Sequence, residues 1–231
     1  MLKILSQIEE GIRAYHILEE GDRILAAISG GKDSLTMLHF LKQIQASSKV
    51  HFDLSAVHIK TDFHCGSCVH REMLKDVFER LDVPYVIKDI KVLDEQKQTN
   101  CFWCSWCRRK CLFETARELG CNKIAFGHHK DDIVETVLLN LFFKGEISTM
   151  TPNQEMFKGE IRLIRPLCLV DEALIKQFAQ ENNFPHQMCR CPYGAVSQRK
   201  TMKSIIDDFS NNFPTIDVRN NIFKSLSNIK M

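Results

Sequence analysis

The sequence lacks the features that would place it in a membrane or among repeat proteins. No hydrophobic run approaches the ~18 residues that a membrane-spanning helix needs. The first residues, MLKILSQIEEGIRAY, are amphipathic rather than signal-like. Internal repeats and low-complexity segments are absent from the sequence as well. We therefore expect a cytoplasmic protein that does not associate with a membrane.

No charge of one sign dominates the sequence. The 231 residues carry a formal net charge of +2, which is too small to indicate a nucleic-acid partner by itself but is compatible with local basic patches. Hydrophobic residues make up 44% of the chain and charged residues 26%, which is ordinary for a globular protein. A chain of this length can bury a sizeable core.

Cysteine, by contrast, is abundant. The chain has ten cysteines, and in a reducing cytoplasm they favour metal binding or catalysis over a disulfide framework. Four of them, together with two tryptophans, fall within the twelve residues NCFWCSWCRRKC, from Asn100 to Cys111. Disulfides, a structural zinc ion and a redox cluster all begin from such spacings, so the rest of the sequence has to decide among them.

Strand and helix patterns alternate along the chain. Short apolar runs bounded by turn residues predict strands, and longer amphipathic runs predict helices. Strands separated by helices form parallel sheets with helices on both faces. We therefore expect one α/β domain over residues 1–231, with a short N-terminal helix within 1–20, a helical C-terminal segment over about 197–231 and a polar loop over 144–160. The predicted strands are 23–29, 53–59, 84–90, 122–127 and 161–167, and the predicted helices are 32–45, 68–81, 108–120, 131–143 and 171–183.

A glycine-containing turn, ISGGKDS from Ile28 to Ser34, follows the first predicted strand. Such a turn aims backbone N–H groups into a concave nest at the positive end of the next helix, which suits phosphate. The Walker pattern G-x-x-x-x-G-K-[ST] is absent, so this is not an ordinary P-loop. The predicted nucleotide site consists of Gly30 and Gly31, the hydroxyl donors Ser29 and Ser34, the cation of Lys32 and the carboxylate of Asp33, which suits Mg²⁺.

A second polar segment, GHHKDD, follows the fourth predicted strand. In it Gly127 permits a close backbone approach, and His128 is a candidate phosphate contact. Asp131 or Asp132 is a candidate ligand of Mg²⁺. A simpler interpretation is that the two aspartates only cap the following helix and favour its dipole, and the two roles are compatible.

These two segments resemble a known family. SGGKDS after a first strand is the signature of the PP-loop ATP pyrophosphatases, and GHHKDD is similar to a region of the PP-loop enzymes that modify tRNA. The resemblance implies a Rossmann-like fold of the adenine nucleotide alpha hydrolase type. It also implies an enzyme that cuts ATP between the α and β phosphates and activates a substrate carbonyl as its adenylate, with Lys32 and Asp33 as catalytic residues.

The cysteine segments narrow the resemblance. NCFWCSWCRRK, together with IRPLCLVDEALIKQFA and CPYGAVSQR, looks like the tRNA 2-thiolation enzymes, above all the 2-thiocytidine (TtcA) family, and the resemblance covers most of residues 15–205. It implies a [4Fe–4S] cluster held by Cys101, Cys104 and Cys191, with Cys189 as the alternative third ligand. Since a closed site would take four thiolates, three leave one iron open to bind hydrosulfide as the nucleophile.

The activity that this resemblance implies is ATP-dependent thiolation of tRNA. A pyrimidine C2 carbonyl, that of cytidine 32, would be adenylated and its oxygen replaced by sulfur from the cluster. The cofactors would be ATP, Mg²⁺ and the [4Fe–4S] cluster, and the partners tRNA and a cysteine desulfurase or another sulfide donor. The sequence leaves the oligomeric state open, with a homodimer as one option. The alternatives are a PP-loop ATP pyrophosphatase that acts on another substrate or through a persulfide relay, and a zinc-stabilised nucleotide- or RNA-binding module.

Several cysteines depart from the family pattern. HCGSC places Cys65 and Cys68 in a second C-x-x-C, and two such pairs can form a structural zinc site. This pair could instead carry a persulfide or modify the cluster. Cys107 and Cys111 are extra thiols beside the first pair, and Cys111, Cys121 and Cys168 are expected to be buried.

The surroundings of the first C-x-x-C allow further predictions. We expect it immediately before a helix whose first turn carries Arg108 and Arg109. The tryptophans Trp103 and Trp106 either shield the cluster or anchor the core, which is the commoner use. The basic stretches RRK (108–110) and QRKTMK (198–203) are candidate RNA contacts, although such stretches are more often simply solvated.

Overall fold

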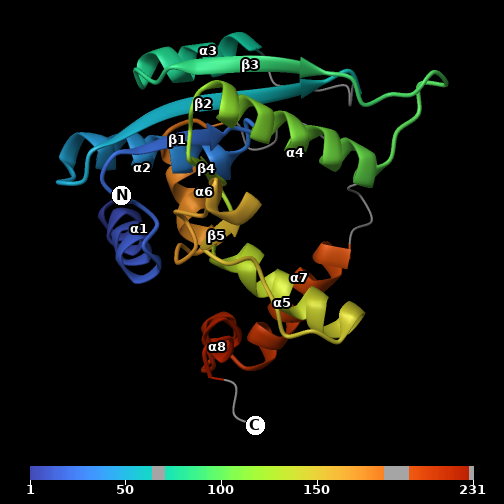
Figure 1. Ribbon diagram of the computed structural model, residues 1–231. Coiled ribbons are helices and arrows are strands. Elements are labelled where there is room, and N and C mark those ends of the chain that lie inside the picture. The colour runs from blue at the N-terminus through green and yellow to red at the C-terminus, as the bar shows by residue number, and fades with distance from the viewer. Residues whose placement is uncertain (64–70, 185–197, 229–231) are drawn as a thin grey trace.

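The fold is centred on one six-stranded sheet with the strand order β3-β2-β1-β4-β6-β5 (Figure 1). The computed structural model describes residues 1–63, 71–184 and 198–228. Neighbouring strands are parallel except for β5 and β6, which are antiparallel. The predicted α/β class is therefore confirmed, and the sheet gains an antiparallel edge. The strands are β1 (Asp22–Ala27), β2 (Phe52–Thr61), β3 (Tyr85–Ile90), β4 (Lys123–Ala125), β5 (Asn153–Met156) and β6 (Ile161–Ile164).

Helices cover both faces of the sheet, as predicted. One hydrophobic cluster joins α1, α2, α3 and α6 to one face, and a second joins α4 to the other. These helices are α1 (Leu2–Tyr15), α2 (Lys32–Ser47), α3 (Arg71–Arg80), α4 (Cys101–Glu118) and α6 (Glu172–Glu181). The remaining helices are α5 (Lys130–Lys144), α7 (Gln198–Asn212) and α8 (Val218–Ser225), which lie together at one end of the molecule (Figure 1).

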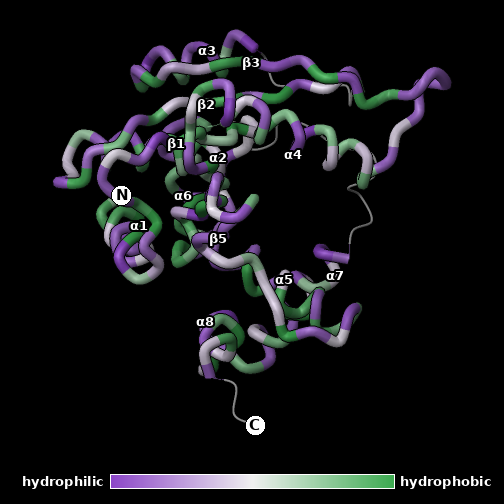
Figure 2. The backbone as a smooth tube through the Cα atoms, viewed as in Figure 1, coloured by the Kyte–Doolittle hydropathy of each residue, from purple (hydrophilic) through white to green (hydrophobic). Residues whose placement is uncertain are grey.

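The first strand shows why both faces need cover. Side chains alternate across a strand, so Ile24 and Ala26 belong to the first cluster while Leu25 belongs to the second. Burial on both faces produces the nearly continuous apolar run that predicted this strand. Figure 2 shows the result, with hydrophobic segments gathered where β1, α2 and α6 meet and hydrophilic ones at the outer turns.

Helix α4 begins earlier than predicted. The C-x-x-C was expected before a helix that begins near Arg108, but the helix already includes Cys101. Asn100 explains the early start, because its side chain caps the helix by accepting a hydrogen bond from the Trp103 amide at 2.8 Å. The prediction was therefore wrong at this boundary. Both cysteines lie in the first turns of α4.

The segment predicted as a polar loop contains secondary structure. Strand β5 pairs antiparallel with β6, and a short 3-10 turn, η1 (Phe157–Gly159), joins the two. Strand β5 was missed because its sequence, NQEM, is polar and lies at the edge of the sheet, where only one neighbour is available. Over the described part of the chain, no helix has the length and apolarity to cross a membrane.

Candidate active site

The glycine turn, residues 28–34, connects the end of β1 to the start of α2. Gly30 has a φ of +88°, which an L side chain rarely adopts. The amide of Gly31 donates to Ser29 Oγ at 3.3 Å, and Ser34 Oγ donates to the Gly31 carbonyl at 2.9 Å. Helix α2 has no side-chain cap, so the turn presents its first N–H groups to a ligand, which is the arrangement that binds phosphate.

Lys32 is held by two carboxylates. Its ammonium lies 2.7 Å from Asp33 Oδ1 and 3.3 Å from Glu172 Oε1 of α6. Burial alone would lower the pKa of Lys32, but its hydrogen bonds and ion pairs with Asp33 and Glu172 raise the pKa above its usual value. Lys32 is therefore a cation that is positioned beside the glycine turn before any phosphate arrives.

Gly127 lets the GHHKDD segment approach the glycine turn. A Cβ atom at this position would lie 2.9 Å from the Asp33 carbonyl carbon, its oxygen and the Ser34 amide nitrogen. Any side chain would force the two segments apart. The close backbone approach expected for Gly127 is therefore present, and its observed partner is the backbone at the start of α2.

His129 stands between the acidic side chains of the two segments. Its imidazole is buried and lies 3.7 Å from Asp33, 3.7 Å from Asp131 and 3.5 Å from Asp132. The sequence predicted the neighbouring His128 as a site residue and missed His129. The pattern alone does not show which of two adjacent histidines faces the acidic side chains, because the start of α5 fixes that.

Asp131 and Asp132 both have protein partners. Asp131 accepts hydrogen bonds from the Glu172 amide at 2.7 Å and from Arg219 Nε of α8 at 2.9 Å. Asp132 accepts from the His129 amide at 3.1 Å, which caps α5, and from Arg199 Nη1 of α7 at 3.0 Å. Asp132 thus caps α5, as in the simpler interpretation, whereas Asp131 contacts the start of α6 instead, and each also binds a C-terminal helix through an arginine. Their role as Mg²⁺ ligands stays a prediction.

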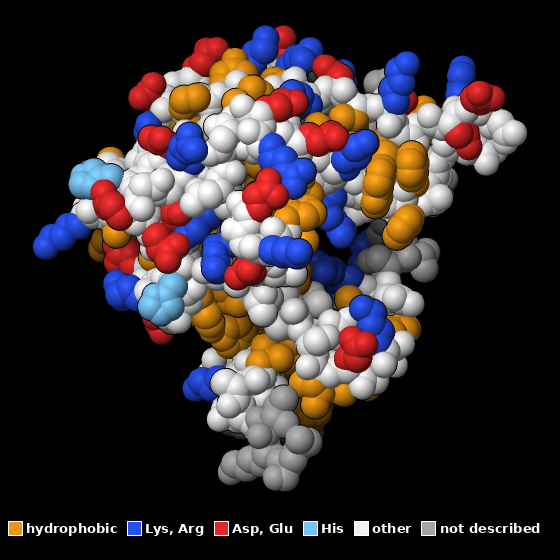
Figure 3. All heavy atoms as spheres, viewed as in Figure 1, with side chains coloured by type: hydrophobic (Ala, Val, Ile, Leu, Met, Phe, Trp, Pro, Cys, Tyr) orange, Lys and Arg blue, Asp and Glu red, His pale blue; other side chains and the backbone are white. Residues whose placement is uncertain are grey.

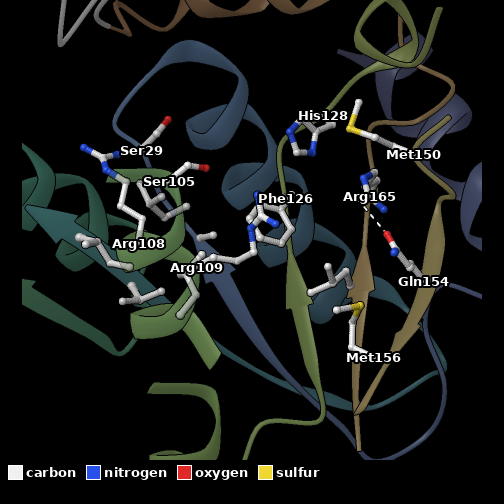
Figure 4. Close-up of a pocket in the computed structure, with 16 residues that line it drawn as sticks. Ser29, Ser105, Arg108, Arg109, Phe126, His128, Met150, Gln154, Met156 and Arg165 are labelled. Carbon is white, nitrogen blue, oxygen red and sulfur yellow. Dashed lines mark hydrogen bonds between the residues drawn. The ribbon is translucent and has the colours of Figure 1, made fainter. Parts of the chain in front are cut away.

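A cavity of about 530 Å³ lies between the glycine turn and α4 (Figure 4). Helix α4 contributes Ser105, Arg108 and Arg109, while Phe126 and His128 follow β4 and Arg165 follows β6. Ser29 of the glycine turn also lines the cavity. Parallel strands end at the same edge of the sheet, which is where ligands of such sheets bind.

Three buried side-chain nitrogens in this wall have no hydrogen-bond partner among the described residues: Arg108 Nε, His128 Nδ1 and Arg165 Nε. Buried polar groups are normally paired, so these atoms point to a polar ligand or to water. Burial is the main cause that lowers the pKa of His128 to about 4, against the charge of Asp132, which raises it. The imidazole is therefore neutral at pH 7 and acts as a hydrogen-bonding group.

The C-x-x-C stands next to this cavity. Residues 101, 105, 108 and 112 share one face of α4, and Ser105, Arg108 and Leu112 of that face line the cavity. The thiols of Cys101 and Cys104 are both free, the first exposed and the second partly so. Two thiols one helical turn apart, open to solvent and without a disulfide, suit the ligands of an iron–sulfur cluster.

The predicted third ligand is not among the described residues. Cys189 and Cys191 lie outside them, as do Cys65 and Cys68 of the second C-x-x-C. Within the described residues, no group of three His, Cys, Asp or Glu side chains is placed to hold a metal ion. The remaining cysteines behave as expected, since Cys111, Cys121 and Cys168 are buried.

Comparison with known proteins identifies the family of this fold. The family model for the PP-loop domain matches residues 3–188. The chain therefore belongs to the PP-loop family.

Within that family, its relatives are tRNA-cytidine(32) 2-sulfurtransferases, which confirms the resemblance to the 2-thiocytidine family. The one from Paraburkholderia phymatum is 35% identical, with 98% of this chain and 68% of the relative covered. The one from Geobacter sulfurreducens is 34% identical, with 99% and 90% covered.

A solved structure shares the fold. The U34-tRNA thiolase NcsA from Methanococcus maripaludis, determined with its [4Fe–4S] cluster, superimposes with a TM-score of 0.76 and 22% sequence identity. The superposition covers 97% of this chain and 78% of the thiolase. At this identity the likeness establishes the fold.

Proposed function

We propose that this chain is an ATP-dependent tRNA sulfurtransferase that replaces the C2 oxygen of cytidine 32 with sulfur. The observation that carries the proposal is one cavity lined both by the glycine turn and by the helix face that begins at Cys101. A phosphate-binding turn and a thiolate pair serve different chemistries. A reaction that consumes ATP and transfers sulfur needs both at one place, and the relatives named above are enzymes of that class.

The glycine turn would bind and orient ATP. Backbone N–H groups at the start of α2 and the Ser29 and Ser34 hydroxyls are donors for phosphate oxygens, and Lys32 balances their charge. Asp33, whose carboxylate lies 2.7 Å from Lys32 Nζ, would hold Mg²⁺ on the same phosphates. The C2 oxygen of the pyrimidine would then bond to the α phosphorus as the bond between the α and β phosphates breaks, so that the base carries AMP and diphosphate leaves.

The cavity would hold the activated base. Phe126 offers an aromatic surface to a nucleobase, and the Arg108 guanidinium favours the negative charge that develops on the departing AMP. His128, neutral at pH 7, contributes a hydrogen bond from the other wall. The second step forms a bond from sulfur to C2 as the bond from C2 to the AMP oxygen breaks.

Cys101 and Cys104 would hold the sulfur-delivering group, with Cys191 as the third thiolate. When bound, a [4Fe–4S] cluster would supply the sulfide that acts as the nucleophile. The chain's own contribution is to hold the cluster on the helix face that continues into the cavity. The sulfur donor would be a cysteine desulfurase or another source of sulfide, and the enzyme would work in the cytoplasm.

We also propose that the enzyme acts as a homodimer. Helix α5 and the turn after it expose four large apolar side chains, Leu141, Phe142, Phe143 and Ile147. An apolar patch of this kind typically marks an interaction surface. Light scattering at micromolar concentration tests this point, and a monomer contradicts it.

The function is tested by incubating the purified enzyme anaerobically with ATP, Mg²⁺, a sulfide source and unmodified tRNA. The expected result is one AMP and one diphosphate for each 2-thiocytidine, with Asp33→Ala losing the product by at least about 100-fold while keeping its iron. Thiolation that proceeds without ATP, or normally in the variant, contradicts the nucleotide site.

The third ligand is tested by comparing two neighbouring cysteines. Cys191→Ala is expected to lose the cluster, because two thiolates cannot retain it, and Cys189→Ala is expected to keep it. Iron content and visible absorption after anaerobic purification measure the difference. The reverse pattern would assign the ligand to Cys189.

A further inference from the structure

The N-terminal half of α4 carries an exposed pair of stacked tryptophans. The rings of Trp103 and Trp106 are 5.2 Å apart between centroids, with an angle of 11° between their planes. Each side chain is 46% exposed, and the neighbouring Phe102 is 79% exposed. Figure 3 shows hydrophobic side chains gathered over this end of α4, next to Lys and Arg side chains. Of the two uses that the sequence left open for the tryptophans, anchoring the core is therefore wrong, and shielding of the cluster stays a prediction.

This pair faces away from the cavity. Residues 103, 106 and 110 share one side of α4, while Ser105, Arg108 and Leu112 line the cavity from the opposite side and Arg109, which also lines it, lies between the two sides. The tryptophans therefore do not line the wall that we assign to the reacting base. A large aromatic surface that is left in water needs another explanation, because aromatic side chains usually bury most of their area.

A cation lies against the pair. Of the three cationic residues between Cys101 and Lys110, Arg108 and Arg109 line the cavity, and Lys110 lies on the side of the tryptophans, where it also pairs with Glu114 at 3.8 Å. The Lys110 ammonium lies 5.6 Å from the centre of the Trp106 ring. Aromatic rings interleaved with cations are the combination with which proteins bind single-stranded nucleic acid, since the rings stack on bases and the cations contact phosphates.

We propose that the pair of Trp103 and Trp106 is a stacking platform for an unpaired RNA base that flanks the nucleotide being modified. This inference rests on the proposed tRNA substrate and adds the contact that holds the RNA on the outer side of α4. About half of each tryptophan side chain is exposed and available to a base, and the absence of acidic residues from Cys101 to Lys110 favours RNA. A second copy of this chain on the same surface is the rival occupant that the experiment must separate.

Because the platform lies away from the reacting base, its loss should weaken tRNA binding and leave the rate of the reaction nearly unchanged. We therefore expect Trp103→Ala/Trp106→Ala to weaken tRNA affinity by roughly tenfold to a hundredfold. The rate constant at saturating tRNA should stay within about twofold, because the cavity is untouched. The slope of affinity against salt should not change, since stacking releases no counterions.

Binding is measured by fluorescence anisotropy of a fluorescein-labelled, unmodified tRNA added to the cluster-containing enzyme. The matched control is Phe209→Ala/Phe213→Ala, because these rings form a similar exposed pair at the C-terminal end of α7, with centroids 4.7 Å apart. This control should bind normally. Trp103→Phe/Trp106→Phe should recover most of the affinity, since it keeps stacking rings. Circular dichroism and light scattering verify the folding and the oligomeric state of each variant.

Tryptophan emission supplies an independent readout, because Trp103 and Trp106 are the two tryptophans of the whole sequence. Saturating tRNA should quench their emission. Three results would overturn the platform: normal affinity of the alanine variant, unchanged emission on binding, or a change of oligomeric state with normal RNA affinity. None of them would contradict the proposed function if the wild type still thiolates tRNA. Wild-type enzyme that binds no tRNA overturns both the platform and the proposed function.

Discussion

Glu172 joins three lysines that come from three helices. Its carboxylate lies 3.3 Å from Lys32 of α2, 2.9 Å from Lys176 of α6 and 2.5 Å from Lys203 of α7. Burial would raise the pKa of Glu172, but the hydrogen bonds from Lys203 and Lys176 and the charge of Lys32 lower it to about 2. Lys32, the proposed phosphate contact, is thus tied to α7 through one side chain.

Glu172→Gln is expected to destabilise the protein by about 2 kcal/mol at pH 7, because three cations lose a shared anion. The folded-state pKa lies below the usual 4.5, so this stabilisation is present above pH 4.5 and is lost as the pH falls toward 2, with about half remaining near pH 3. Urea unfolding at pH 7 and pH 3 measures it, with Glu181→Gln on the same helix as the control. Equal effects of the two variants would contradict the central role of Glu172.

Glu135 is expected to behave in the opposite way. It is buried in α5, and burial together with the charge of Asp132 raises its pKa to about 7. Ionisation therefore costs stability as the pH rises from about 4.5 through about 7. Glu135→Gln should be more stable than the wild type at pH 8, by up to about 3 kcal/mol, and equally stable at pH 4.5. A stability difference that does not change with pH would refute this prediction.

At the scale of single residues, the sequence predicted which chemical groups the site contains better than it predicted which residues contact one another. The glycine turn and Gly127 were predicted because glycine itself indicates a backbone conformation or a close approach that other residues do not allow. Glu172 and Arg219 were missed because their partners, Lys32 and Asp131, lie more than 80 positions away in the sequence. Nothing in the local pattern around either residue indicates such a contact.

At the scale of elements, the start of α4 decides how the thiols are presented. The Asn100 cap satisfies the Trp103 amide, and the Asn100 carbonyl accepts from the Cys104 amide at 3.0 Å. Both cysteines lie in the turn that this cap stabilises, so their spacing is fixed by helical geometry.

Asn100→Ala is expected to fray this turn, at a cost of about 1 kcal/mol. Iron should then be lost to a chelator about fivefold faster than from the wild type, while ATP binding is unchanged because the glycine turn follows a different strand. Asn100→Asp, which keeps the cap, is the control. Iron loss at the wild-type rate in Asn100→Ala would show that the cap does not support the cluster.

Strands and helices were predictable where burial imposes a regular spacing of apolar residues along the sequence. The five strands of the parallel part of the sheet were predicted from their apolar runs, and each overlaps an observed strand. Strand β5 and the start of α4 were missed because a polar edge strand and a cysteine-rich first turn carry no such signal. The sequence likewise did not predict the exposure of Trp103 and Trp106, because tryptophan usually indicates the core.

At the scale of the whole molecule, the proposed reaction depends on two halves that come from separate parts of the chain. The glycine turn follows β1, and the thiol-bearing helix follows β3. Parallel strands bring both to one edge of the sheet, where the cavity lies between them. The extent of the domain over residues 1–231 and the third cysteine stay predictions, since the latter lies outside the described residues.

The most direct test compares iron-free and cluster-reconstituted enzyme in the same anaerobic assay. Each preparation is incubated with ATP, Mg²⁺, unmodified tRNA and a sulfide source, and the digested tRNA is examined for 2-thiopyrimidines by mass spectrometry. If Cys101 and Cys104 hold the sulfur-delivering cluster beside the cavity, thiolated nucleoside forms only after reconstitution. Equal yields from the two preparations would contradict delivery of sulfur from a cluster.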